Sequence, residues 1–267
     1  MNETTTLIDL LNKKEKLVAM LAPSFPIIFE YPKIITMLKN LGFSYTVEVA
    51  VGAKKTNEEL LALMKANPNA RYITCPCPTI VRMIKKTMPQ YAKYMTHNVD
   101  SPMVATAKII QEKYPGFRPI FIGPCIMKKM EANEDVPELN ILVLTYTEML
   151  EVFKHFNIGE YINPNDPACA GRKFDIGEPG LTELYALDGG LSHSSGLASQ
   201  LQTEELKVVS GVQNNIKAIQ EFDTNPKIRL LDILNCPGGC IGGPGIQSNL
   251  GTQERIERIK NYFNKTQ

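Results

Sequence analysis

Short apolar runs alternate with amphipathic, helix-like segments along most of this chain, and this alternation constrains the fold more than any other feature. Residues 16–22 and 119–122 have the composition of buried strands, whereas residues 32–41 carry apolar side chains at helical spacing and end at Gly42. Alternating strands and helices predict a mostly parallel sheet with helices on both faces. We therefore expect an α/β fold, either as one large domain or as two lobes.

The remaining elements follow from the same patterns. Further strands are expected at residues 45–51, 71–74, 139–146, 184–187, 206–210 and 228–234. Further helices are expected from residue 56 and at 79–94, 102–114, 147–156 and 252–263. The stretch 157–180 is rich in Asn, Pro, Gly and Asp, which predicts a long surface loop or an insertion.

Four cysteines lie just past the ends of predicted strands, and they are Cys77, Cys125, Cys236 and Cys240. Ends of parallel strands meet at one edge of a sheet, so residues far apart in sequence can converge there. Four thiolates suit an iron-sulfur cluster or zinc. Zinc usually takes ligands as close pairs, whereas three separate segments supply them here, so we favour the cluster. Unrelated buried thiols, and Cys75 as a ligand in place of Cys77, remain alternatives.

Composition bounds the possible partners and location. The 29 basic and 28 acidic residues nearly cancel, which argues against nucleic acid and an anionic membrane surface as partners. No apolar run is long enough to span a bilayer, and the first residues lack the pattern of a signal peptide. We expect a cytoplasmic protein whose six cysteines are reduced, with Cys169 an idle thiol in an irregular loop.

Three stretches resemble the signatures of the iron-only (FeFe) hydrogenase catalytic domain, in the same order. They are residues 74–78, 123–131 and 236–243, with the sequences TCPCP, GPCIMKKME and CPGGCIGG. The resemblance covers the chain from about residue 16 and is supported by the tripeptides at 22–24 and 100–102. The run at 80–82 is more similar to the sensory branch of the family.

The resemblance implies two α/β lobes with mostly parallel sheets flanked by helices, and a metal site in the cleft between them. Residues 1–15 would be an N-terminal tail and 16–267 a single domain. Its lobes would cover approximately 16–118 and 119–251, with a closing helix at 252–264.

The resemblance also implies a cofactor and the residues that hold it. Cys77, Cys125, Cys236 and Cys240 would ligate a 4Fe-4S cubane, and Cys240 would also bridge to a diiron centre bearing CO and cyanide. The cofactor-binding candidates are Pro23, Ser24, Met103, Pro124 and Lys128. The catalytic candidates are Lys128, which would donate to a cyanide, Cys240 and Ser24. The implied reaction is the reversible interconversion of dihydrogen with protons and electrons.

Several positions depart from the family pattern. Pro76 replaces the cysteine that relays protons, Met103 replaces a glutamine, and Gly123 and Leu234 replace methionines. Since proline cannot exchange a proton, we expect a slow or sensory hydrogenase-type domain. The clusters that feed electrons would precede residue 1, so an electron-transfer or signalling partner domain outside this chain is expected.

Two other hypotheses stay open. The chain is alternatively a non-enzymatic 4Fe-4S protein that resembles the hydrogenase-like assembly factors and lacks the diiron centre. Pro76, Met103 and Gly123 favour this reading, while Lys128 and the intact glycines of the third signature favour the first. A third hypothesis is the sensor part of a longer signalling chain.

Overall fold

The computed structural model describes residues 2–159, 172–177 and 180–267. The strands are β1 (Leu17–Leu21), β2 (Tyr45–Glu48), β3 (Tyr72–Ile73), β4 (Arg118–Gly123), β5 (Leu142–Thr145), β6 (Leu206–Ser210) and β7 (Leu230–Leu234). The α-helices are α1 (Glu3–Asn12), α2 (Lys33–Leu41), α3 (Ala50–Ala66), α4 (Pro78–Thr87), α5 (Pro102–Lys113), α6 (Met127–Met130), α7 (Tyr146–His155), α9 (Gly190–Ser194), α10 (Leu197–Gln200), α11 (Val212–Thr224) and α12 (Thr252–Thr266).

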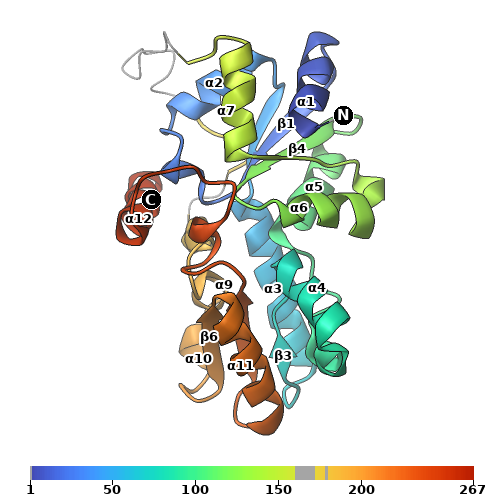
Figure 1. Cartoon of the computed structure of the whole chain (residues 1–267), viewed down its shortest axis with the longest axis vertical. Coiled ribbons are helices and arrows are strands. Elements are labelled where there is room, and N and C mark those ends of the chain that lie inside the picture. The colour runs from blue at the N-terminus through green and yellow to red at the C-terminus, as the bar shows by residue number, and fades with distance from the viewer. Residues whose placement is uncertain (1, 160–171, 178–179) are drawn as a thin grey trace.

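The strands form a four-stranded sheet of order β2-β1-β4-β5 and a three-stranded sheet of order β3-β7-β6. Every pairing is parallel, with Ala19 opposite Ile120 between β1 and β4, and Ile73 opposite Leu231 between β3 and β7. Figure 1 places the first sheet with α1, α2 and α7 in the upper part, and β3 and β6 with α4, α10 and α11 in the lower part. The structure is therefore the expected α/β fold with parallel sheets flanked by helices.

Burial on both faces explains why the strands are continuously apolar. All residues of β1 are buried. Along β7 the period of two directs Leu231 and Ile233 into a core shared with α4 and α11, and Leu230 into a core shared with α3 and Tyr185. The apolar run at 228–234 thus contributes side chains to two cores, one on each face of the sheet.

The sheet pairing divides the chain differently from the expected boundary at 118/119. β4 and β5 join β1 and β2, while β3 from the first half joins β6 and β7. The chain therefore leaves the first sheet along α3 and returns to it by α5. Local periodicity predicts strands but carries no information about which strands pair.

Three local expectations are wrong. Residues 3–12, expected within a polar tail, form α1, in which Asn2 caps the first turn and Leu7 is fully buried. α3 begins at Ala50 and not near Thr56, whose hydroxyl donates to Gly52 O at 3.0 Å within the helix. The strand expected at 184–187 is absent, because Leu181–Leu184 is a 3-10 helix and Leu187 makes only an isolated bridge with Gly239.

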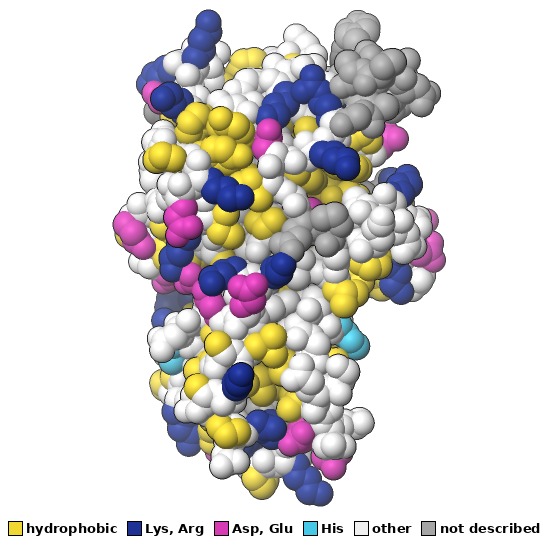
Figure 2. Space-filling model, turned by 180° about the vertical axis from the view of Figure 1, so that it is seen from behind, with side chains coloured by type: hydrophobic (Ala, Val, Ile, Leu, Met, Phe, Trp, Pro, Cys, Tyr) yellow, Lys and Arg dark blue, Asp and Glu magenta, His cyan; other side chains and the backbone are white. Residues whose placement is uncertain are grey.

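The stretch expected to be a surface loop is described only in part. Ile176 forms a bridge with Val47 of β2, and Asp175 accepts a hydrogen bond from Thr46 N at 2.8 Å, so this part lies along the sheet edge. Cys169 lies outside the described residues. The part of the chain that is described contains no helix long and apolar enough to cross a membrane. Figure 2 shows basic and acidic side chains interspersed over the face that it presents.

Candidate metal centre

The cysteines of the three motifs come from both sheets. Cys77 directly precedes α4, Cys125 follows β4, and Cys236 follows β7. Cys240 opens the short 3-10 helix Cys240–Gly242. Because β4 belongs to the four-stranded sheet and β7 to the three-stranded one, these residues come from the strand ends of both sheets.

Burial and neighbouring thiols both raise the pKa values of the motif cysteines. Burial raises the pKa of Cys240 well above its usual value, and the charges of Cys77, Cys125 and Cys236 raise it further. Burial also raises the pKa of Cys236 to about 11, again with contributions from Cys77 and Cys125. Four thiolates are therefore unfavourable together unless a positively charged group joins them, and iron or another metal supplies that charge.

The turn between Cys236 and Cys240 depends on glycine. Gly239 has φ 93°, and a Cβ there would lie 2.5 Å from Ala186 O. Arg255 of α12 holds the turn from the other side, with Nη1 donating to Ile241 O at 2.8 Å. The close approach of Gly239 to Ala186 fixes Cys240 beside the segment 184–188.

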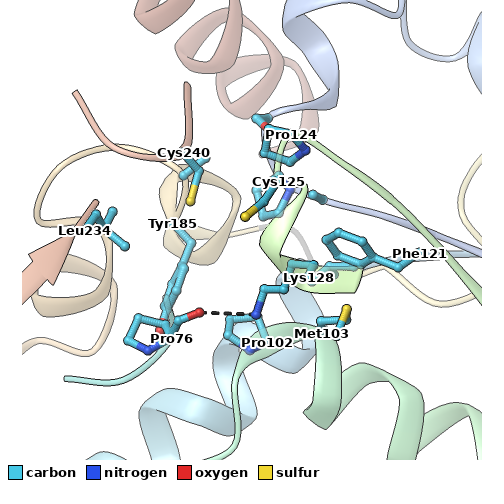
Figure 3. Close-up of a pocket in the computed structure, with 15 residues that line it drawn as sticks. Pro76, Pro102, Met103, Phe121, Pro124, Cys125, Lys128, Tyr185, Leu234 and Cys240 are labelled. Atoms are coloured by element: carbon cyan, nitrogen blue, oxygen red, sulfur yellow. Dashed lines mark hydrogen bonds between the residues drawn. The ribbon is translucent and has the colours of Figure 1, made fainter. Parts of the chain in front are cut away.

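A cavity lies in front of two of these cysteines, Cys125 and Cys240. It offers about 70 Å³ to the centre of a water-sized molecule, several times what one water needs. Its lining includes Ala22, Pro23, Ser24, Val49, Pro76, Pro102, Met103, Phe121, Pro124, Cys125, Lys128, Tyr185, Ala186, Leu234 and Cys240. Figure 3 shows Cys125 and Cys240 extending their sulfur atoms into the same space. All the residues named above as cofactor-binding or catalytic candidates therefore border one cavity.

Lys128 is buried at the wall of this cavity, with all its donors directed to protein acceptors. Its Nζ donates to Pro76 O at 3.2 Å and to Ser101 Oγ at 2.9 Å, and it pairs with the buried Glu131. The first of these bonds is drawn in Figure 3. An ammonium has three N–H donors, so a ligand in the cavity would have to replace one of these acceptors.

Ser24 is fully buried, and a tyrosine orients its hydroxyl. Tyr146 Oη donates to Ala22 O at 3.1 Å and lies 2.7 Å from Ser24 Oγ. Since the single phenolic proton goes to Ala22, the Ser24 hydroxyl donates to Tyr146. The backbone of Pro23 and Ser24 then remains the part of this segment that can approach a ligand.

Cys75 does not join the other four thiols. It lines a separate cavity with Lys85, Thr96 and His97, and its Sγ–H donates to Ile73 O at 3.4 Å. Burial raises the pKa of this thiol to about 11. The charge of Cys77, by contrast, contributes to the raised pKa values of Cys125, Cys236 and Cys240.

The described residues do not form a site for a single ion. No group of three or more His, Cys, Asp or Glu side chains within 2–159, 172–177 and 180–267 is placed to hold one metal ion. A cubane binds one thiolate per iron, so its ligands stand farther apart than those of one zinc ion. Among the described residues, the four cysteines are thus not grouped as a closed single-ion site requires.

Residues 15–244 match the family described as the iron only hydrogenase large subunit, C-terminal domain. The chain belongs to this family. Among curated proteins it is similar to the cytosolic Fe-S cluster assembly factor NAR1 of Encephalitozoon cuniculi, with 23% identity over 206 residues. The match covers 70% of this chain and 53% of NAR1, so the chain spans about half the length of that relative.

Solved hydrogenases share the fold. A variant of the FeFe-hydrogenase HydA1 from Chlamydomonas reinhardtii superimposes with a TM-score of 0.70 at 19% identity, covering 97% of this chain and 88% of HydA1. HydA(deltaEFG), solved in a study of stepwise H-cluster assembly, gives a TM-score of 0.71 at 19% identity with the same coverage. Both comparisons place this member of the hydrogenase family in the same fold.

The structure gives a physical reason for one departure from the hydrogenase pattern. A Cβ at Gly123 would lie 2.4 Å from the ring of Phe121, which lines the cavity. A methionine at position 123 would displace that ring. The Phe121 ring can take its position only because residue 123 has no side chain.

Sequence reasoning missed Glu131 and Tyr185. Glu131 lies three residues after Lys128, a spacing at which oppositely charged helix residues meet, and this signal was available. Tyr185 lies in the range 184–187 that the pattern predicts as a strand, and a tyrosine in an apolar run indicates a buried ring whose hydroxyl needs a partner.

Proposed function

We propose that this chain binds a 4Fe-4S cluster through Cys77, Cys125, Cys236 and Cys240. The observation that supports the proposal is the cavity that Cys125 and Cys240 line together, although they come from different motifs, in a family for which an iron-sulfur cluster is expected. Four cysteines are the usual ligand set of a cubane. The separation of Cys75 from this group leaves one ligand from each of the first two motifs and two from the third.

We further propose that the adjacent cavity accepts a diiron centre, which when bound supplies the dihydrogen chemistry. The cavity is larger than a water site and its lining is mostly apolar, which supports this proposal. Cys240 borders both the cysteine cluster and the cavity, as a bridging ligand must. Lys128 would donate to an anionic ligand after exchanging one protein acceptor, and the Pro23–Ser24 backbone would approach another.

The activity that follows is reversible dihydrogen oxidation and proton reduction at a low rate, or hydrogen and redox sensing. Pro76 borders the cavity and carries no exchangeable proton, so it cannot relay protons. The chain would need an electron-transfer or signalling partner domain. The cytosolic relative supports a cytoplasmic location.

A second candidate is a non-enzymatic iron-sulfur role in cluster assembly. The observation that favours it is the commitment of Lys128 to Pro76, Ser101 and Glu131, which leaves no ammonium proton for a cyanide. The similarity to NAR1 supports the same reading.

Anaerobic reconstitution separates the two. Iron and sulfide should give one cubane per chain, measured by iron and sulfide content and by electron paramagnetic resonance after reduction. Adding a diiron precursor should then produce infrared bands of CO and cyanide. A cubane without these bands supports the assembly role, and tetrahedral zinc binding without sulfide uptake refutes the cluster.

A pair of cysteine variants tests the ligand assignment. Cys240→Ala should lose both centres, because this thiol borders the cavity and the other three cysteines. Cys75→Ala should retain the cubane at the wild-type stoichiometry. A cluster that survives Cys240→Ala but not Cys75→Ala would overturn the assignment.

A further inference from the structure

Tyr185 carries a buried hydroxyl that has no partner. The residue is 7% exposed, and its ring packs with Leu191, Leu197 and Leu230 between the second sheet and α3. Among the described residues, no atom forms a hydrogen bond with its Oη. Leaving a buried hydroxyl unpaired is costly, so such a group points to a missing acceptor.

Tyr185 also borders the cavity beside the cysteines. Figure 3 shows its ring extending between Cys240 and Pro76. Burial raises the pKa of its phenol, and the charges of Asp232 and Cys240 raise it further. The neutral hydroxyl is therefore the stable form, and it remains a hydrogen-bond donor.

The other side-chain donors around the cavity have acceptors within the protein. The three protons of Lys128 go to Pro76 O, Ser101 and Glu131. The hydroxyl of Ser24 donates to Tyr146. Asp232, which lies near Tyr185, accepts from Ser192 N at 3.0 Å and has no hydrogen bond with the phenol. Among the described hydroxyl and amino groups of the lining, that of Tyr185 is the one left with its proton unused.

We propose that the Tyr185 hydroxyl donates a hydrogen bond to the cluster group bound beside Cys240, either to a sulfur of the cubane or to a ligand of a diiron centre. The inference rests on the proposed cluster and adds a tuning residue to it. A hydrogen bond to a cluster sulfur stabilises the reduced, more negative state and raises the reduction potential.

The test compares Tyr185→Phe with the wild type after reconstitution with iron and sulfide alone. Redox titration followed by electron paramagnetic resonance should show a lower midpoint potential in the variant, by about tenfold in the equilibrium constant for reduction, or about 59 mV for one electron. Tyr262→Phe is the matched control. Its buried hydroxyl donates to Glu48 at 2.9 Å, away from the cavity, so its potential should equal that of the wild type.

The diiron-loaded form distinguishes the two acceptors. A shift already present in the cubane-only protein assigns the acceptor to a cluster sulfur. Equal potentials in the cubane-only proteins, together with CO and cyanide bands that differ between the loaded variant and the loaded wild type, assign the acceptor to the diiron centre. Equal potentials and equal bands in both proteins, or an equal shift in Tyr262→Phe, overturn the inference while leaving the proposed cluster in place. A wild-type chain that binds no cluster overturns both.

The cluster-free protein provides a second readout. Because the hydroxyl has no protein partner, Tyr185→Phe should unfold at the same or a higher urea concentration than the wild type. A clear loss of stability in the cluster-free variant would show that the hydroxyl serves the protein itself and would contradict the role proposed here.

Discussion

The pair formed by Lys128 and Glu131 permits a quantitative prediction about the wall of the cavity. Both side chains are buried, with 10% and 11% exposure, and Glu131 is the only carboxylate that pairs with Lys128 among the described residues. In Glu131→Gln the ammonium keeps Pro76 O and Ser101 Oγ as acceptors but loses its counter-charge. Removing one partner of a buried ion pair costs about 3–5 kcal/mol, and the two remaining acceptors bring the expected cost to the lower end, about 3 kcal/mol.

Thermal unfolding of the cluster-free chain measures this cost. At roughly 2–4 °C per kcal/mol for a domain of this size, Glu131→Gln should lower the Tm by roughly 6–12 °C. Glu134→Gln is the matched control, because Glu134 pairs with Arg82 at 3.1 Å but its side chain is 58% exposed. An exposed pair contributes less than about 1 kcal/mol, so this variant should stay close to the wild type.

A double variant separates lost attraction from an unpaired charge. Lys128→Met combined with Glu131→Gln removes both charges and should be more stable than Glu131→Gln alone. If Glu131→Gln unfolds at the same temperature as Glu134→Gln, or if the double variant is no more stable than the single one, the pair is not the buried, mutually dependent pair described above.

Two further predictions concern the buried carboxyl group of Glu48 and the turn between Cys236 and Cys240. Burial, with the charge of Glu183 adding to it, raises the pKa of Glu48 from 4.5 to about 8. The folded state therefore binds this proton more tightly than the unfolded state, so stability is present below pH 4.5 and is lost as the pH rises through 8. Urea unfolding should show a smaller loss between pH 5 and 8 in Glu48→Gln, and an unchanged loss would contradict the assignment. Gly239→Ala should lower both iron content and Tm, because its Cβ would meet Ala186 O at 2.5 Å, whereas Gly116→Ala, at φ 82° with open space around it, should keep the wild-type iron content.

Much of the fold is readable from the sequence because strands and their ends are local features. The apolar runs that became β1, β4 and β7 are short and end at Pro, Gly or Cys, so their position needs no knowledge of the rest of the chain. The same Pro and Gly residues mark the strand ends beside which the motif cysteines lie. Helix α1 is not predicted from the sequence, because Leu7 is its single fully buried residue and one residue gives little periodic signal.

The site is readable in part. Residues that the motifs predict for the site, including Lys128 and Cys240, line one cavity in the structure. The sequence favours Cys77 as the ligand of the first motif but leaves Cys75 as an alternative. The direction in which each of these two side chains points depends on the surrounding tertiary structure. Two acceptors of Lys128, Pro76 O and Ser101 Oγ, lie on segments more than 25 residues away, and the isolation of the Tyr185 hydroxyl likewise depends on distant segments.

The α/β class and the thiols at the ends of strands can be predicted from the sequence, because periodicity and turn residues act over a few positions. The pairing of β4 with β1 and of β3 with β7 is seen only in the folded chain, and it puts the cysteine motifs on strands of two different sheets. The physical reason is that strand pairing and burial depend on contacts between distant segments. Those contacts also set which donors already have protein acceptors and which, as at Tyr185, are left for a ligand.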